Sequence, residues 1–196
     1  MIRALFLPRL RAGLSRFWRA DSGSQSVEAV LVAPMVLFAI VFCYSYFAAF
    51  EAKSRANKAA YTISDYISRQ TAAVDQDFID GMADIYRFLN NDGDVGLRVT
   101  TVVFTTAENP DGEYKIVWSA VSGTGYTALA EGDEAVILDR LPYLAQGQQM
   151  VVIETTRNWE SVFNTRLAEV SFSDFVTTTP RFAPQVVWET PDAPAS

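Results

Sequence analysis

The stretch AVLVAPMVLFAIVFCYSYFAAF, residues 29–50, has 22 residues without a charge and lies between Glu28 and Glu51. As an α-helix it would be about 33 Å long at ~1.5 Å per residue, enough to cross the hydrocarbon core of a bilayer. Several aromatic rings gather toward its carboxyl end, where amphipathic rings favour the lipid–water boundary: Tyr44, Tyr46, Phe47 and Phe50. The stretch therefore predicts a membrane-spanning helix.

Two other interpretations of this stretch are less favoured. A buried helix of a soluble protein rarely runs so long without a charge. A cleaved secretory signal usually has an apolar region of only ~7–15 residues, and no A-x-A site precedes the charged segment that begins at Glu51. Pro34 lies near the start of the span. We expect it to kink the helix, and neighbouring groups in a bilayer can satisfy the carbonyl that it frees.

Charge is distributed unevenly along the chain. Residues 1–23 hold five arginines and one aspartate, whereas the remainder holds 11 basic and 22 acidic side chains. An acidic domain with no long basic run repels phosphates, so we expect no nucleic-acid partner.

The chain has no histidine, and its single cysteine, Cys43, lies within the apolar span. We therefore expect no intrachain disulfide, no bound metal and no cofactor.

The basic leader, residues 1–23, precedes the span. Its arginines are interleaved with apolar side chains, a pattern typical of a segment that lies on an anionic membrane surface. A long acidic domain can cross a membrane despite the few basic residues that follow the span. We therefore expect a single-pass protein with its amino terminus in the cytoplasm and its carboxyl-terminal domain outside.

The segment GSQSVE, residues 23–28, leads directly into the apolar span. It resembles the processing site of type IV prepilins, where a membrane peptidase cuts after glycine and leaves glutamate as the fifth residue of the mature chain. Cleavage between Gly23 and Ser24 would place Glu28 about one helical turn from the new α-amino group. A carboxylate entering hydrocarbon needs such an amine, from the same chain or a neighbour, to offset its desolvation. Otherwise Glu28 is a polar residue at the membrane boundary, near a helix amino terminus.

The helical pattern continues beyond the span as a predicted stalk, residues 51–92. Apolar or small side chains recur there at spacings of four, three and four: Ala56, Ala60, Ile63 and Ile67. The small side chains of Ala56, Ala59 and Ala60 permit close packing, either with a helix of another chain or with the protein's own domain.

A second helix is expected after Asp75 or Asp77, either of which can cap it. Its apolar stripe would contain Phe78, Met82, Ile85 and Leu89. The following NNDG, residues 90–93, lacks the ligand spacing and closing glutamate of a calcium loop, so we interpret it as a polar turn.

From residue 97 the pattern changes to that of strands. β-Branched and aromatic residues predict four of them, at residues 97–106, 113–121, 150–157 and 169–178. In the second predicted strand, alternation places one set of side chains on a single buried face: Tyr114, Ile116, Trp118 and Ala120. The short apolar segment at residues 135–138 suits either a strand or a helix. The chain thus predicts an α+β fold with a mainly antiparallel sheet: transmembrane helix 24–50, stalk 51–92, domain 93–182 and tail 183–196.

Two segments together resemble TadE/TadG-type proteins of the tight-adherence (Tad or Flp) pilus system. One is residues 23–50, a polar stretch, a glutamate and an apolar helix interrupted by proline; the other is LPYLAQG, residues 141–147, followed by a strand. This resemblance implies a pilin-like architecture in a bacterial inner membrane, with a periplasmic outer domain. It also implies a prepilin peptidase, other pilins and Tad assembly proteins as partners.

A minor pilin-like, or pseudopilin, component needed to assemble an adherence pilus is the function that these observations favour. The alternative is an uncleaved, membrane-anchored periplasmic assembly, binding or sensor protein. An enzyme is the least favoured class. Carboxylate pairs such as Asp133 with Glu134, or Glu154 with Glu160, have no nucleophile, base and orienting group at interpretable spacing, so we expect no catalytic residues.

Overall fold

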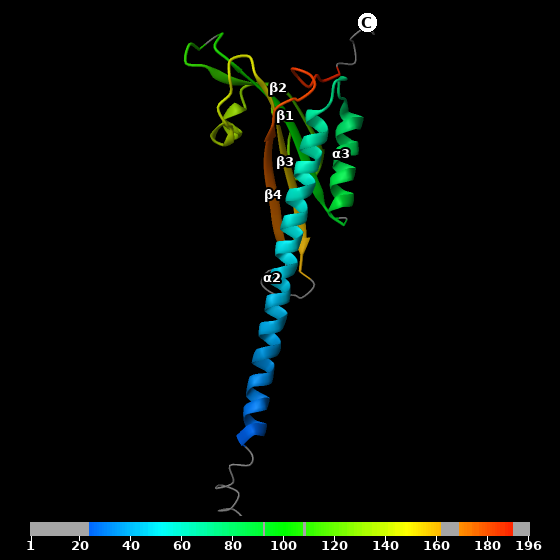
Figure 1. Cartoon of the computed structure of the whole chain (residues 1–196), viewed down its shortest axis with the longest axis vertical. Helices are drawn as coiled ribbons and strands as arrows, with labels where there is room; N and C mark the ends of the chain where they lie inside the picture. The colour runs from blue at the N-terminus through cyan, green and yellow to red at the C-terminus, as the bar shows by residue number, and fades with distance from the viewer. Residues whose placement is uncertain (1–23, 92, 108, 162–168, 190–196) are drawn as a thin grey trace, which may run out of the picture. The chain divides into compact units, whose positions relative to one another are not determined.

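The computed structural model describes residues 24–91, 93–107, 109–161 and 169–189. The predicted leader, residues 1–23, and the last seven residues of the predicted tail lie outside the described residues. The chain divides into two compact units, residues 1–46 and 47–196. Helix α2 (Ser24–Ser68) contributes to both units: its first half, residues 24–46, lies in the first unit and its second half, residues 47–68, in the second. Helix α3 (Gln76–Leu89) belongs to the second unit (Figure 1).

Helix α3 begins where the sequence predicts. The Asp75 carboxylate accepts a hydrogen bond from the backbone N–H of Phe78 at 2.8 Å, which makes Asp75 the N-cap. The predicted apolar stripe is only partly correct, because Ile85 is exposed while Tyr86 is fully buried. The buried stripe consists of Ile79, Met82, Ala83 and Tyr86. The helix is therefore rotated by about one residue from the expectation, so that the large Tyr86 ring enters the core.

The sheet has four antiparallel strands: β1 (Val95–Thr105), β2 (Glu113–Gly123), β3 (Gln149–Glu160) and β4 (Glu169–Thr178). Their spatial order is β2-β1-β3-β4. All four predicted strands are present: β1 begins earlier than predicted, β2 and β3 extend beyond their predicted residues, and β4 has the predicted bounds. The α+β class and the antiparallel sheet are therefore confirmed.

A bulge in β2 changes which side chains share a face. The pairing of Thr101 with Trp118 is followed by that of Val102 with Ile116, which leaves Val117 without a partner on β1. Tyr114 and Ile116 pack against one core cluster, whereas Trp118 and Ala120 belong to the cluster on the opposite face. The prediction of one continuous buried face along β2 is wrong because the extra residue inverts the alternation.

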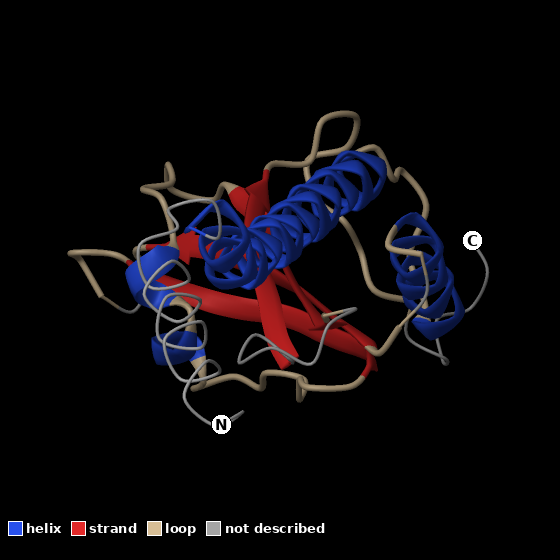
Figure 2. Cartoon of the chain, turned by 90° about the horizontal axis from the view of Figure 1, so that it is seen from below, coloured by secondary structure: helices blue, strands red, loops and turns tan. Residues whose placement is uncertain are grey.

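The sheet of the second unit is covered on both faces. Helix α3 and the second half of α2 pack on one face, in a core to which all four strands contribute (Figure 2). The other face is covered by the segment between β2 and β3, which buries Leu129 and Ile137 and partly buries Leu141 and Leu144. This segment contains two short 3₁₀ turns, η2 (Glu134–Val136) and η3 (Leu138–Arg140), so residues 135–138 form no strand.

Polar side chains bond to the backbone of both outer strands. On β2, the carbonyl of Val121 accepts from Gln76 Nε2 at 2.9 Å, and the N–H of Ile116 donates to Glu134 Oε1 at 3.3 Å. On β4, the carbonyl of Ser173 accepts from the Nζ of Lys53 at 2.9 Å. Each outer strand thus has backbone groups bonded to side chains of other elements.

Part of the predicted tail belongs to the folded unit. Val186 is buried in the core shared with the helices, and the indole of Trp118 donates to its carbonyl at 2.8 Å. Val74 and Trp188 form a parallel bridge. Before them, the Arg181 N–H donates to the carbonyl of Ser68 at 2.8 Å. The folded chain therefore extends past the predicted boundary at residue 182, because the apolar residues near 186–188 have a place in the core.

Candidate functional site

The first half of α2 exposes apolar side chains in all directions. The exposed fractions of Val27, Leu31, Met35 and Phe38 lie between 62% and 74%, and few described side chains before residue 47 are covered. Ser45 donates its hydroxyl to the carbonyl of Val41 at 3.0 Å, so even this polar group is satisfied within the helix. A surface of this kind is stable in lipid or against other apolar helices rather than in water. The described chain has one helix long and apolar enough to cross a membrane.

The predicted processing residues lie at the start of this helix. Gly23 is outside the described residues, and Ser24 is the first residue of α2. Glu28 is exposed and lies one turn further on, so a carboxylate stands at the entry of the apolar stretch. Helix α2 continues through Pro34, as a proline near the start of a lipid-spanning helix allows. Cleavage, amine pairing by Glu28 and the kink at Pro34 stay predictions.

The second half of α2 has a stripe of small buried residues. Ala52, Ala56, Ala59 and Ala60 are at most 6% exposed, and Ile63 and Ile67 continue the stripe. Of these, Ala59, Ala60, Ile63 and Ile67 belong to the core formed with α3 and the sheet. Of the two uses that the sequence leaves open for these side chains, packing on the protein's own domain is therefore the one observed. The opposite side of this half is polar and exposed, with Ser54, Lys58, Tyr61 and Thr62.

An ion pair joins this half of α2 to the outer strand β4. The Nζ of Lys53 lies 2.6 Å from Oδ1 of Asp174, which also accepts from Nδ2 of Asn57 at 3.2 Å. The Asp174 carboxylate is buried, and its other oxygen has no hydrogen-bond partner among the described residues. Two helical side chains thus hold one strand carboxylate, which fixes the register of α2 against the sheet.

On the opposite face of the sheet, Arg98 and Glu154 form a buried ion pair. Nε and Nη2 of Arg98 lie 2.7 and 2.5 Å from Oε2 of Glu154. The guanidinium also donates to the carbonyl of Thr127 at 3.1 Å and stacks over the Tyr126 ring at 4.9 Å. Burial raises the pKa of the Tyr126 hydroxyl, and the nearby Glu154 charge adds to this effect. The cluster fastens the β2–β3 segment to the sheet.

The carboxylate pairs considered for acid–base chemistry have other contacts. Glu154 and Glu160 are six residues apart on β3, about 20 Å at ~3.3 Å per residue. Asp133 accepts from the N–H of Ala130 at 2.9 Å, while Glu134 bonds the edge of β2. The structure therefore does not bring Glu154 and Glu160 together, and Asp133 and Glu134 each have a separate backbone partner.

The helix-ending turn after α3 has the predicted polar character. Asn90 is the C-cap of α3, and its side-chain amide donates to the carbonyl of Tyr86 at 2.8 Å. Asn91 adopts a positive φ of 58°, which asparagine tolerates better than most residues. The described residues contain no group of three or more acidic, cysteine or histidine side chains that could hold a metal ion.

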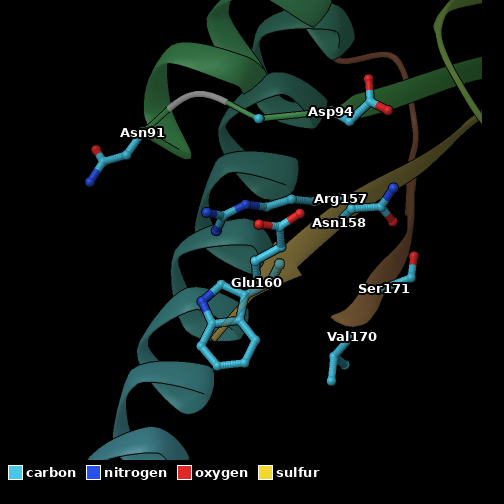
Figure 3. A pocket seen from close by; sticks show the side chains of 9 residues that line it. Asn91, Asp94, Arg157, Asn158, Glu160, Val170 and Ser171 are labelled. Carbon is cyan, nitrogen blue, oxygen red and sulfur yellow. The ribbon is translucent and has the colours of Figure 1, made fainter. Parts of the chain in front are cut away.

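An open pocket of about 810 Å³ lies beside this turn, at the end of β3 and the beginning of β4. Figure 3 shows Arg157, Asn158 and Glu160 on β3, with Val170 and Ser171 on β4 and Asp94 before β1. Arg157 is only 8% exposed. Burial lowers the pKa of its guanidinium below the usual value, and the Arg55 charge acts in the same direction.

Sequence reasoning missed Lys53, Arg157 and Asp174. A signal was nevertheless present, because alternation from the core residues Val151 and Ile153 assigns residue 157 to the helix-covered face of β3. Asp174 pairs with Thr155 and occupies the same face. A charge at an inward-facing position of a strand is rare unless it has a partner. The alternation therefore identifies both residues, whereas it does not identify their partners on other elements.

Comparisons with protein-family models, curated proteins and solved structures give no match to this chain.

Proposed function

We propose that this protein is a minor pilin-like component of a Tad-type adherence pilus, anchored in a bacterial inner membrane with its second unit in the periplasm. The observation that carries the proposal is the division of α2. Its first half has apolar side chains exposed on all sides, while its second half packs on an antiparallel sheet. This combination suits a protein that shares its amino-terminal helix with lipid or with the helices of other pilins.

Contacts with neighbouring pilins would use the first half of α2. The alanine stripe of the second half is occupied by the protein's own core, so it is not free for another helix. Glu28 would then be the recognition charge, paired with an amino terminus in the apolar environment. Ser24 to Glu28 spans one helical turn, so the partner amine can come from the same chain or from a neighbour.

The first experiment measures the mass of the amino-terminal peptide of protein isolated from its native membrane, with and without the prepilin peptidase. The proposal expects a new terminus at Ser24 that depends on the peptidase. An intact Met1 in both strains would contradict processing. The protein would then be the alternative, a permanently anchored assembly or binding protein.

The second experiment compares Glu28→Ala with Glu51→Ala, a matched change at the other end of the apolar stretch. Glu51 is exposed, and among the described residues it forms an ion pair with Arg55 along the helix, at 2.5 Å. We expect both variants to stay in the membrane fraction, and only Glu28→Ala to lose pilus assembly. Normal piliation in the Glu28→Ala strain would refute the role given to Glu28.

A further inference from the structure

The buried guanidinium of Arg157 has incomplete bonding. Its Nη1 lies 3.4 Å from Oδ1 of Asn90, a long hydrogen bond, and its Nε has no partner among the described residues. The described residues also provide no ion pair for it. The carboxylate of Asp174, on the same face of the sheet, already has Lys53 as its counter-ion.

An uncompensated buried charge is strongly unfavourable. Here Arg157 lines an open pocket, so a ligand can reach it from solvent. The planar guanidinium fork matches the two oxygens of a carboxylate. The presence of Arg157 in the lining therefore favours an anionic group in the pocket.

Other residues of the pocket narrow the class of ligand. Asp94 and Glu160 line it and are exposed, so their negative charges disfavour multiply charged anions such as phosphate. The same charges attract a positive group on the ligand. Val170 and the mostly buried Trp159 add apolar surface. The volume of about 810 Å³ lies within the ~300–1,000 Å³ range of ligand sites.

We propose that this pocket binds a carboxylate that has a positive charge close to it, as in an amino acid or a short peptide, and that Arg157 holds the carboxylate. The charges of Asp94 and Glu160 favour the positive group through their field rather than by direct contact, because Figure 3 shows the Asp94 carboxylate directed away from the Arg157 guanidinium. The site does not depend on the pilus role proposed above. Its ligand can be a free amino acid or the exposed end of a peptide, because both present the same chemistry.

The test uses the full-length protein in nanodiscs and follows indole N–H signals by NMR, with Trp159 as the reporter inside the pocket. The probes are phenylalanine and the tripeptide Gly-Gly-Phe, each compared with its carboxamide at constant ionic strength. We expect saturable shifts of the Trp159 signal with a carboxylate probe and at least tenfold weaker binding of its carboxamide. Tighter binding of phenylalanine would identify the ligand as a free amino acid, whereas tighter binding of the tripeptide would identify it as the end of a peptide.

Three variants complete the test. Arg157→Met removes the charge and should abolish binding, Arg157→Lys should weaken it at least tenfold, and Arg181→Met, an exposed arginine outside the pocket, should leave it unchanged. In the unliganded wild type the buried guanidinium has no counter-ion among the described residues. The free energy of unfolding of the Arg157→Met variant should therefore be at least as large as that of the unliganded wild type. The proposal is overturned if no probe shifts the Trp159 signal, if carboxamides bind as well as carboxylates, or if Arg157→Met binds normally.

Discussion

The two halves of α2 are built from similar numbers of residues but meet different surroundings. In the first half, large side chains such as Leu31 and Leu37 are more than 60% exposed. In the second, Ala60 and Ile63 are at most 1% exposed and lie in a core with α3 and the sheet. The first half is apolar around its whole circumference, whereas the second has an apolar stripe and a polar face. The pattern around the helix, rather than helix propensity, decides which half a protein domain covers.

The largest expected effect comes from the matched truncations Ile63→Ala and Leu37→Ala. Ile63→Ala removes buried atoms and leaves a cavity, so it should lower the free energy of unfolding of the second unit by about 2–5 kcal/mol. Leu37→Ala should change it by less than about 0.5 kcal/mol, because that side chain is outside the core. Denaturant titration in detergent, followed by tryptophan fluorescence, measures both. If both variants lowered the free energy of unfolding by the same amount, the described difference between the two halves of α2 would be wrong.

A smaller effect is expected where the packed half meets β4. Lys53→Met removes the counter-ion of the buried Asp174 carboxylate but leaves Asn57 as a hydrogen-bond donor. Since the Lys53 ammonium is partly exposed, we expect a loss of about 1–2 kcal/mol. Lys58→Met, on the exposed face of the same half, is the control. If both lysine variants unfold at the same denaturant concentration, the ion pair does not stabilise this contact.

The smallest effect should appear only at high pH. Burial raises the pKa of the Tyr86 hydroxyl, so the folded protein holds this proton more tightly than the unfolded chain. The resulting stability is fully present below about pH 10, the unfolded value, and is lost as the pH rises toward the raised folded value. Tyr86→Phe should therefore lose less stability between pH 8 and 11 than the wild type. Tyr61→Phe, on the exposed face of α2, should follow the wild type; identical pH profiles for all three proteins would contradict the prediction.

The sequence predicts the elements of this fold because most of them have a clear period. Residues 29–50 form part of one helix, Asp75 caps α3, and four β-branched segments form the four strands. Local chemistry is sufficient in each of these cases. It fails at Val117, because a bulge depends on how two strands align and is not visible in either strand alone.

Long-range contacts account for the other differences. The stripe from Ala59 to Ile67 is compatible with several partners, and only the folded chain shows that its own core covers it. Val186 looks like part of a proline-rich tail, yet it fills a place between the helices and Trp118. The pocket at Arg157 brings together residues from three strands or their flanking turns, a proximity that no local pattern specifies.

The side chains that bond the outer strands affect how the protein behaves at high concentration. Gln76 and Glu134 bond backbone groups of β2, and Lys53 bonds the carbonyl of Ser173 on β4. An unprotected edge is a template on which a second chain can add a strand, the first step of edge-to-edge aggregation. These three bonds make strand addition costly at both edges, so a high concentration of the protein does not by itself lead to aggregation through the sheet.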